Sequence, residues 1–211
     1  MSSESSRPAR IRQTYTDGVR RLAARSVTSL ARTRVTPNAL TAAGVTLCAV
    51  AAVLVYFEYR NEILFYYLGG SIFVIGSILD ILDGALARRS GKGTPFGAFL
   101  DSTTDRVSEA FVLGAIALVF YRQREEVALA FTFAAVVGSF LVSYTRARAE
   151  ALGICGDVGI GSRAERVVVI GVGLALAPWG VLPYAIYLLT ATAWITVLQR
   201  VLHVRRELNS R

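Results

Sequence analysis

Four aspartates lie within two apolar stretches of the chain, where charged side chains are costly. Asp80 and Asp83 are three residues apart, and Asp101 and Asp105 are four apart. Each pair therefore shares one face of a helix, because residues at these spacings are neighbours on the helix surface. The connection between the two stretches is short, so the two helices should run antiparallel and side by side. We expect the four carboxylates to meet in one pocket near one end of the helices.

A pocket of four carboxylates needs compensating positive charge, because burying even one unpaired carboxylate costs several kcal/mol. Oxygen ligands alone favour a hard divalent cation, so we expect Mg²⁺, with Mn²⁺ as the alternative, rather than Zn²⁺. Two such ions about 3.5–4 Å apart can hold the attacking and leaving oxygens of a phosphoryl transfer. The alternative is structural: the aspartates pair with Arg88, Arg89 and Arg106 and only hold the helices together.

The whole chain is both apolar and basic. Of its 211 residues, 54% are hydrophobic and 18% are charged, with 23 Lys and Arg against 15 Asp and Glu. Soluble domains average about 25% charged residues, so this composition is typical of a membrane protein. One His and two Cys leave almost no ligands for a zinc cluster or a disulfide framework.

The chain divides into a basic leader (residues 1–34), a hydrophobic domain (35–205) and a short tail (206–211). Apolar residues at spacings of three and four, with arginines between them, predict an amphipathic helix over residues 9–34 that lies along the membrane surface. Six apolar segments follow and predict an all-α integral membrane bundle of six transmembrane helices. Their approximate bounds are Asn38–Phe57, Ile63–Ala87, Phe96–Tyr121, Val127–Glu150, Arg166–Pro178 with some preceding residues, and Leu182–Val204. Arginines concentrate in the leader, the tail and alternate connections, so we expect both termini in the cytoplasm and the protein in the plasma membrane.

The aspartates belong to a longer motif with fixed spacing. It reads Asp80-x-x-Asp83-Gly84-x-x-Ala87-Arg88, then eight residues, then Gly97-x-x-x-Asp101-x-x-x-Asp105. In every fixed position it resembles the signature of the CDP-alcohol phosphotransferase family. The resemblance implies a six-helix membrane enzyme, often a homodimer. Such an enzyme transfers a phosphoryl-linked group from a CDP-activated donor to an alcohol and releases CMP.

The resemblance also implies roles for individual residues. The four aspartates would hold the two metal ions, and Asp105 would also act as general base for the acceptor hydroxyl. The site for the CDP-lipid donor would be bordered by Gly84, Ala87, Arg88 and Gly97. Asn38 follows Thr36 and Pro37 in a segment that resembles one common in the family, and it would lie near the nucleotide. The alternative is that this segment only caps and begins a helix.

A second polar cluster bears on the acceptor alcohol. It comprises Ser143, Arg146, Arg148, Arg163, Arg166 and Arg200. Guanidinium groups bind phosphate oxygens in pairs, so several arginines at one cavity favour a phosphorylated acceptor over a neutral alcohol. The alternative is the ordinary excess of cations at cytoplasmic helix ends.

The spacing in this cluster resembles that of the phosphatidylinositol-phosphate synthases of actinobacteria, which use CDP-diacylglycerol and inositol 1-phosphate. Two positions differ: Arg146 stands where that subfamily has Lys, and Ser162 stands where it has Glu. Because of these departures, a phosphatidylglycerophosphate synthase using glycerol 3-phosphate is the alternative.

Two other classes of protein fit the pattern less well. A metal-ion transporter would place its carboxylates near the middle of the membrane and often in repeated halves. Here the aspartates lie near helix ends and the sequence has no convincing internal repeat. If the protein were a membrane scaffold, replacing its aspartates would reduce only its stability. We therefore predict a lipid-synthesising transferase whose partners are CDP-diacylglycerol, inositol 1-phosphate, membrane lipid and a second copy of the chain, without nucleic acid.

Overall fold

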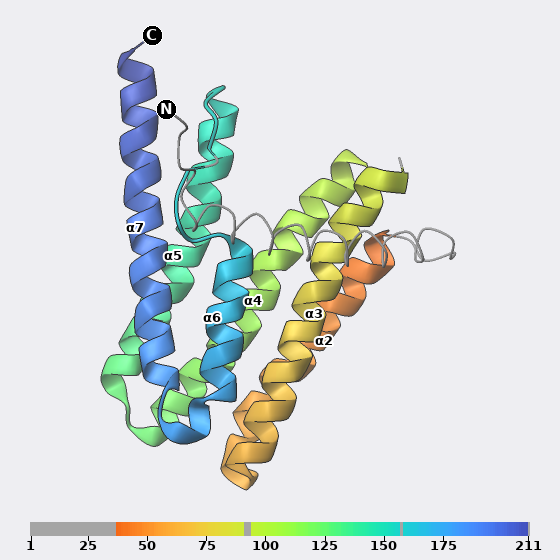
Figure 1. Cartoon of the computed structure of the whole chain (residues 1–211), viewed down its shortest axis with the longest axis vertical. Coiled ribbons are helices and arrows are strands. Elements are labelled where there is room, and N and C mark those ends of the chain that lie inside the picture. The colour runs from red at the N-terminus through yellow and green to blue at the C-terminus, as the bar shows by residue number, and fades with distance from the viewer. Residues whose placement is uncertain (1–36, 91–93, 157, 211) are drawn as a thin grey trace, which may run out of the picture.

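The computed structural model describes residues 37–90, 94–156 and 158–210, and of residues 37, 81 and 83–90 it describes the backbone alone. Within these ranges all regular secondary structure is helical, as predicted, and no strand is present (Figure 1). The helices are α2 (Pro37–Tyr56), η1 (Phe57–Arg60), α3 (Glu62–Ser90), α4 (Pro95–Gln123), α5 (Glu126–Ala151), α6 (Arg163–Ala175), η2 (Ala177–Trp179) and α7 (Leu182–Asn209). The amphipathic helix predicted over residues 9–34 lies outside the described residues.

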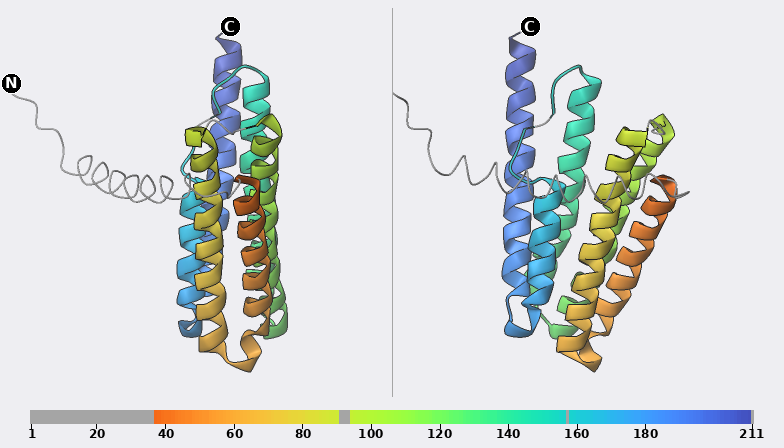
Figure 2. Two further views of the ribbon diagram at one scale, coloured as in Figure 1. Left: turned by 90° about the vertical axis from the view of Figure 1, so that its right-hand side faces the viewer. Right: turned by 45° about the vertical axis from the view of Figure 1, so that its right-hand side comes forward.

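The six α-helices form two groups of three. Helix α2 packs along α3 and α4, whereas α5 packs along α7, with α6 between α3 and α7. In Figure 1 the group of α2, α3 and α4 and the group of α5, α6 and α7 lie close together at the bottom of the view and diverge towards the top, and α6 begins about halfway up. Helix α7 extends past the ends of α3 and α4 (Figure 2). The first residues of α6 therefore lie where the two groups separate.

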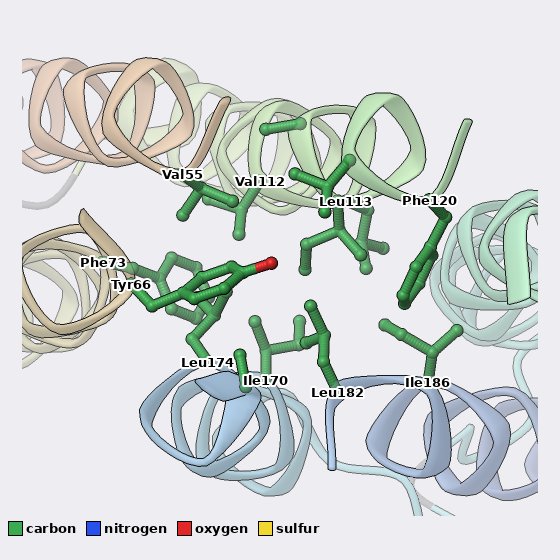
Figure 3. Packing of buried hydrophobic residues seen from close by; sticks show 14 of the residues in the cluster. Val55, Tyr66, Phe73, Val112, Leu113, Phe120, Ile170, Leu174, Leu182 and Ile186 are labelled. Atoms are coloured by element: carbon green, nitrogen blue, oxygen red, sulfur yellow. The ribbon is translucent and has the colours of Figure 1, made fainter. Parts of the chain in front are cut away.

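One apolar core joins the two groups. Figure 3 shows Tyr66 and Phe73 of α3, Leu113 of α4 and Ile170 of α6 pointing towards one another, and all four side chains are at most 1% exposed. Large apolar side chains also cover the outside of the bundle; Phe133, for example, is 72% exposed. An apolar outer surface around a packed core is what a protein surrounded by lipid requires.

Two glycines bring α2 and α3 into close approach beside the acidic motif. A Cβ added at Gly44 would lie 3.0 Å from the carbonyl oxygen of Gly76, and one added at Gly76 would lie 3.0 Å from the carbonyl oxygen of Gly44. Small residues allow helix backbones to pack this closely in membranes. The crossing lies one turn before Asp80, whose Cβ would be 3.3 Å from a Cβ at Gly44. It fixes Asp80 against α2.

The expectation of six spans exceeds what helix length and composition show. Four stretches are long and apolar enough to cross a membrane: Asn38–Arg60, Glu62–Asp80, Glu126–Ala151 and Leu182–Asn209. Helix α4 falls short because its first half carries several charged residues. Helix α6 has 13 residues, about 20 Å of rise against a hydrocarbon core of about 30 Å. What the structure supports is an all-helical membrane protein with four candidate spans among the described residues.

Candidate active site

Three of the four predicted aspartates meet. Asp80 of α3 and Asp101 and Asp105 of α4 each offer a carboxylate oxygen, and these atoms lie within 4.8 Å of one another. They come together because α3 and α4 run antiparallel across a short connection, as the sequence predicted. Helix α3 continues through Asp83, but the side chain of Asp83 lies outside the described part of the structure. Its role as a metal ligand stays a prediction.

The start of α4 sets the positions of its aspartates. Thr94 caps the helix, because its hydroxyl oxygen accepts a hydrogen bond from the backbone nitrogen of Gly97 at 3.0 Å, and Pro95 occupies the first turn. A Cβ added at Gly97 would lie 3.6 Å from the side-chain oxygen of Asn38. The structure thus brings together two of the residues predicted to border the donor. Of the other three, Gly84, Ala87 and Arg88, the structure describes only the backbone.

Arg163, the first residue of α6, bridges the acidic group. One terminal nitrogen donates to Oδ2 of Asp80, and Nη1 lies 2.5 Å from Oδ1 of Asp105. From the sequence we predicted that Arg163 binds the acceptor phosphate. Arg106 was one of the arginines that would pair with the aspartates under the structural alternative. Arg106 makes the looser contact, with 3.9 Å between its Nη1 and Oδ2 of Asp105, and it donates to the backbone oxygen of Ser102.

The acidic group fits a divalent cation. The guanidiniums of Arg163 and Arg106 cannot balance three carboxylates, so negative charge remains in excess among the described residues. Asp80 is 3% exposed, and its Oδ1 has no hydrogen-bond partner among the described residues. A buried carboxylate oxygen without a partner is costly, and a hard cation would satisfy it. An oxygen-only ligand set without His or Cys suits Mg²⁺ or Mn²⁺.

A cavity of about 220 Å³ opens beside Asp105. Its wall consists of Asp105, Arg106, Glu109, Val142, Ser143, Arg146, Val158, Gly159, Gly161, Ser162, Arg163, Arg166 and Arg200. Five of the six residues predicted to bind the acceptor phosphate are therefore brought together; the sixth, Arg148, is exposed on α5 and is not part of this wall. Five arginines against two carboxylates make the cavity electropositive.

The connection from α5 to α6 forms one side of the cavity and is anchored on α7. The backbone nitrogen of Gly161 donates to Oγ1 of Thr196 at 3.0 Å. Arg200 donates from Nε to the carbonyl oxygen of Val158 at 2.7 Å. Gly159 has φ +127°, and a Cβ there would overlap the methyl group of Thr196. A glycine is therefore required at this close approach.

Ser162 has a local role that explains one departure from the resembling subfamily. Its side chain caps α6 by accepting from the backbone nitrogen of Glu165, while the Glu165 side chain accepts from the backbone nitrogen of Ser162. This capping box fixes the start of α6. It thereby places Arg163 and Arg166 in the first turn, where both line the cavity.

The sequence analysis missed Glu109. This side chain lies one turn beyond Asp105 on α4 and binds Arg166 through two hydrogen bonds of 2.8 and 2.9 Å. The signal was present, because Asp101, Asp105 and Glu109 follow at a constant spacing of four. The spacing alone does not show which residue Glu109 would contact, because that partner lies far away in the sequence.

The chain matches known proteins over most of its length. Residues 34–204 match the sequence model of the CDP-alcohol phosphatidyltransferase family. An archaetidylinositol phosphate synthase of Pyrococcus horikoshii is 38% identical over 182 residues, which is 85% of this chain and 89% of the relative. A phosphatidylinositol phosphate synthase of Mycobacterium marinum is 38% identical over 178 residues, 81% of this chain and 74% of the relative.

Solved structures agree with these sequence matches. The crystal structure of Mycobacterium tuberculosis phosphatidylinositol phosphate synthase with CDP-DAG bound superposes with a TM-score of 0.76 at 30% identity, and covers 87% of this chain and 94% of that one. The same enzyme in complex with manganese and citrate also gives a TM-score of 0.76. On this evidence, the chain belongs to the CDP-alcohol phosphatidyltransferase family.

Proposed function

We propose that this protein is a phosphatidylinositol phosphate synthase, which transfers the phosphatidyl group of CDP-diacylglycerol to inositol 1-phosphate and releases CMP. The observation that carries the proposal is the position of Asp105. This residue belongs both to the acidic group and to the wall of the arginine-lined cavity. A proton acceptor thus lies between a site suited to a metal-bound pyrophosphate and a site suited to an anionic acceptor.

The proposed cofactor is Mg²⁺, as two ions, with Mn²⁺ as the alternative. Asp80, Asp83, Asp101 and Asp105 would hold it, and the unpartnered oxygen of Asp80 supports this assignment. When bound, the metal neutralises the pyrophosphate of the donor and the departing CMP. The manganese complex of the Mycobacterium tuberculosis enzyme supports a divalent metal in this family.

The chain's own residues would carry the remaining steps. Asp105 takes the proton from the acceptor hydroxyl, because the other carboxylate of the cavity wall, Glu109, binds Arg166 with both of its oxygens. The acceptor oxygen then forms a bond to the β-phosphorus of CDP-diacylglycerol. The bond from that phosphorus to the oxygen of CMP breaks, and CMP leaves with the bonding electrons. Arg163, which pairs with Asp105, orients this carboxylate.

The donor would lie on the other side of Asp105. Asn38 and Gly97 are close together at the starts of α2 and α4, and we assign them to the nucleotide with Gly84, Ala87 and Arg88. Glycine beside a bound nucleotide allows the backbone to approach it closely. The acyl chains of the donor would remain in the surrounding lipid.

The acceptor phosphate would bind in the electropositive cavity. Ser143, Arg146, Arg163, Arg166 and Arg200 line it, and arginines bind phosphate oxygens in pairs. Glycerol 3-phosphate carries the same charged group, so charge alone does not select the alcohol. The names of the relatives favour inositol phosphate.

The membrane arrangement is part of the proposal. We assign residues 35–205 to one transmembrane domain in which α4 and α6 complete a set of six spans, with residues 1–34 and 206–211 outside it. Helix α4 has 29 residues, about 43 Å of rise, which is long enough to cross the core. The cavity holds five arginines, and by the positive-inside rule we assign it and both termini to the cytoplasmic side of the plasma membrane. The functional unit would be a homodimer.

The test is CMP release by the purified protein in detergent and lipid with CDP-diacylglycerol and Mg²⁺. Inositol 1-phosphate, glycerol 3-phosphate, free inositol and serine are compared as acceptors. Release with inositol 1-phosphate alone is the expected result. Release with glycerol 3-phosphate instead would keep the aspartate chemistry and overturn the acceptor assignment, and no release with any acceptor would overturn the whole proposal.

A further inference from the structure

We propose that Glu109 is a positioning residue, which holds the guanidinium of Arg166 in the orientation that binds the acceptor phosphate. The inference rests on the proposed function in one respect, the anionic acceptor. Glu109 belongs neither to the motif of eight fixed positions that contains the aspartates nor to the arginine cluster of the cavity.

The contact between Glu109 and Arg166 is bidentate. Nε of Arg166 donates to Oε1 of Glu109 at 2.8 Å, and Nη2 donates to Oε2 at 2.9 Å. The two side chains are only 11% and 7% exposed. Two parallel hydrogen bonds between two planar groups fix the plane and the rotation of the guanidinium as well as its distance.

Further partners hold this pair from two other directions. The hydroxyl of Ser139, on α5, donates to Oε1 of Glu109 at 2.9 Å. The carbonyl oxygen of Gly161, in the connection before α6, accepts from Nη1 of Arg166 at 3.1 Å. Arg166 is thereby held by Glu109 of α4 and by the segment before α6, and α5 holds Glu109 in place through Ser139. A side chain held this firmly loses little conformational entropy when it binds a ligand.

The hydrogen bonds also leave Arg166 able to bind phosphate. A guanidinium has five N–H groups. Three of them are used by Glu109 and Gly161, so one N–H on each terminal nitrogen has no partner among the described residues. Arg166 lines the cavity. Two N–H groups on adjacent nitrogens are what two oxygens of a phosphate require.

The other cavity arginines differ in how they are held. Arg146 pairs with Glu150 on the exposed surface, where both side chains are about half exposed. Arg163 is shared between Asp80 and Asp105. Arg166, in contrast, is oriented by the buried carboxylate of Glu109, which is not one of the three aspartates of the acidic group. Replacing Glu109 should therefore disturb the orientation of Arg166 without removing a metal ligand.

The experiment compares Glu109→Gln with a matched control, Glu58→Gln. Glu58 is also buried and forms an ion pair with Arg122, but at the opposite end of the bundle. Inositol 1-phosphate is titrated calorimetrically into the full-length protein in detergent with Mg²⁺, and KM is measured for donor and acceptor. We expect Glu109→Gln to weaken inositol 1-phosphate binding and raise the acceptor KM at least about tenfold, with the donor KM within about twofold. Glu58→Gln should change none of these three values by more than about twofold.

A purely structural role for Glu109 predicts a different result. Loss of stability alone would affect donor and acceptor equally, and would be matched by Glu58→Gln. Unchanged acceptor binding in Glu109→Gln, or equal changes for donor and acceptor, would overturn the inference. If Glu109→Gln does not fold, Ser139→Ala serves as the second variant, because it removes one hydrogen bond and keeps the ion pair. It should weaken acceptor binding about two- to threefold, and unchanged binding would count against the inference.

A double-mutant cycle shows whether Glu109 acts through Arg166. In an Arg166→Gln background, adding Glu109→Gln should produce no further loss of acceptor binding; a second, independent loss would overturn the inference. The titration measures binding, whereas the proposed function is tested by CMP release. Failure of the wild-type protein to release CMP therefore counts against the proposed function, and wild-type acceptor affinity in Glu109→Gln counts against the inference.

Discussion

The two ends of the bundle both carry buried charges, but they use them differently. Where α3 begins and α4 ends, Glu58 is paired with Arg122 at 2.6 Å. Arg122 also donates to the carbonyl oxygen of Tyr56 at 2.9 Å, and its guanidinium lies 4.6 Å from the centre of the Tyr59 ring. One carboxylate meets one cation, and aromatic rings cover that cation.

At the other end, the charges of the described residues are unbalanced. Arg163 bridges Asp80 and Asp105, and Asp101 lies beside them in the same group of three carboxylates. A carboxylate oxygen of Asp80 is buried without a hydrogen-bond partner among the described residues, and an electropositive cavity of about 220 Å³ adjoins the group. An ion pair with matched charges stabilises the fold, whereas a cluster with unbalanced charge requires ligands. We therefore interpret the Glu58–Arg122 pair as structural and the three aspartates as a candidate metal site.

The strongest test of this comparison is Asp105→Asn. We expect turnover to fall by a factor of about 10³ or more, because asparagine cannot take the proton of the acceptor hydroxyl. The isosteric side chain should leave the thermal unfolding temperature in detergent close to the wild-type value. CMP release measures the first quantity and a fluorescence melt the second. A turnover rate near that of the wild type would remove Asp105 from the mechanism.

The second test concerns the metal. Asp80→Asn removes a charge from the buried ligand set, so Mn²⁺ should bind at least about tenfold more weakly. Electron paramagnetic resonance of free Mn²⁺ measures this binding without any turnover. Glu58→Gln, which removes a carboxylate from the other end, should bind Mn²⁺ as the wild type does. Equal affinities in the wild type and Asp80→Asn would exclude Asp80 as a ligand.

A third test divides the site into donor and acceptor sides. Arg166 lines the cavity but does not pair with any residue of the acidic group. Arg166→Ala should therefore raise the KM for the acceptor about tenfold or more and leave the KM for CDP-diacylglycerol within about twofold. Initial rates at varied concentrations of each substrate give both constants. Equal increases in the two would contradict the assignment of Arg166 to the acceptor phosphate.

Much of the fold and of the acidic site follows from local pattern. The apolar segments and the spacing of the aspartates predict helices, their antiparallel pairing and the meeting of Asp80 with Asp105. These features depend on residues that are close in sequence or joined by a short connection. The family resemblance covers the same region, and the match to residues 34–204 confirms it.

What the sequence did not predict depends on how distant helices cross. Arg163 is 83 residues from Asp80, and Arg166 is 57 residues from Glu109. Both pairs exist because side chains in the first turn of α6 reach α3 and α4, and no local pattern specifies that position. The sequence placed these arginines correctly at one cavity, but it could not tell which of them already have carboxylate partners.

The smallest effect on catalysis is expected at the balanced end. Glu58→Gln leaves Arg122 without its carboxylate partner, so it should lower the free energy of unfolding by about 1–3 kcal/mol. The unfolding temperature should therefore fall, while kcat and both KM values stay within about twofold of the wild type. Thermal unfolding and CMP release measured on the same preparation test the two halves of this expectation. A selective change in acceptor KM would mean that the two ends are coupled through α4, because Arg122 and the acidic residues Asp105 and Glu109 lie on that one helix.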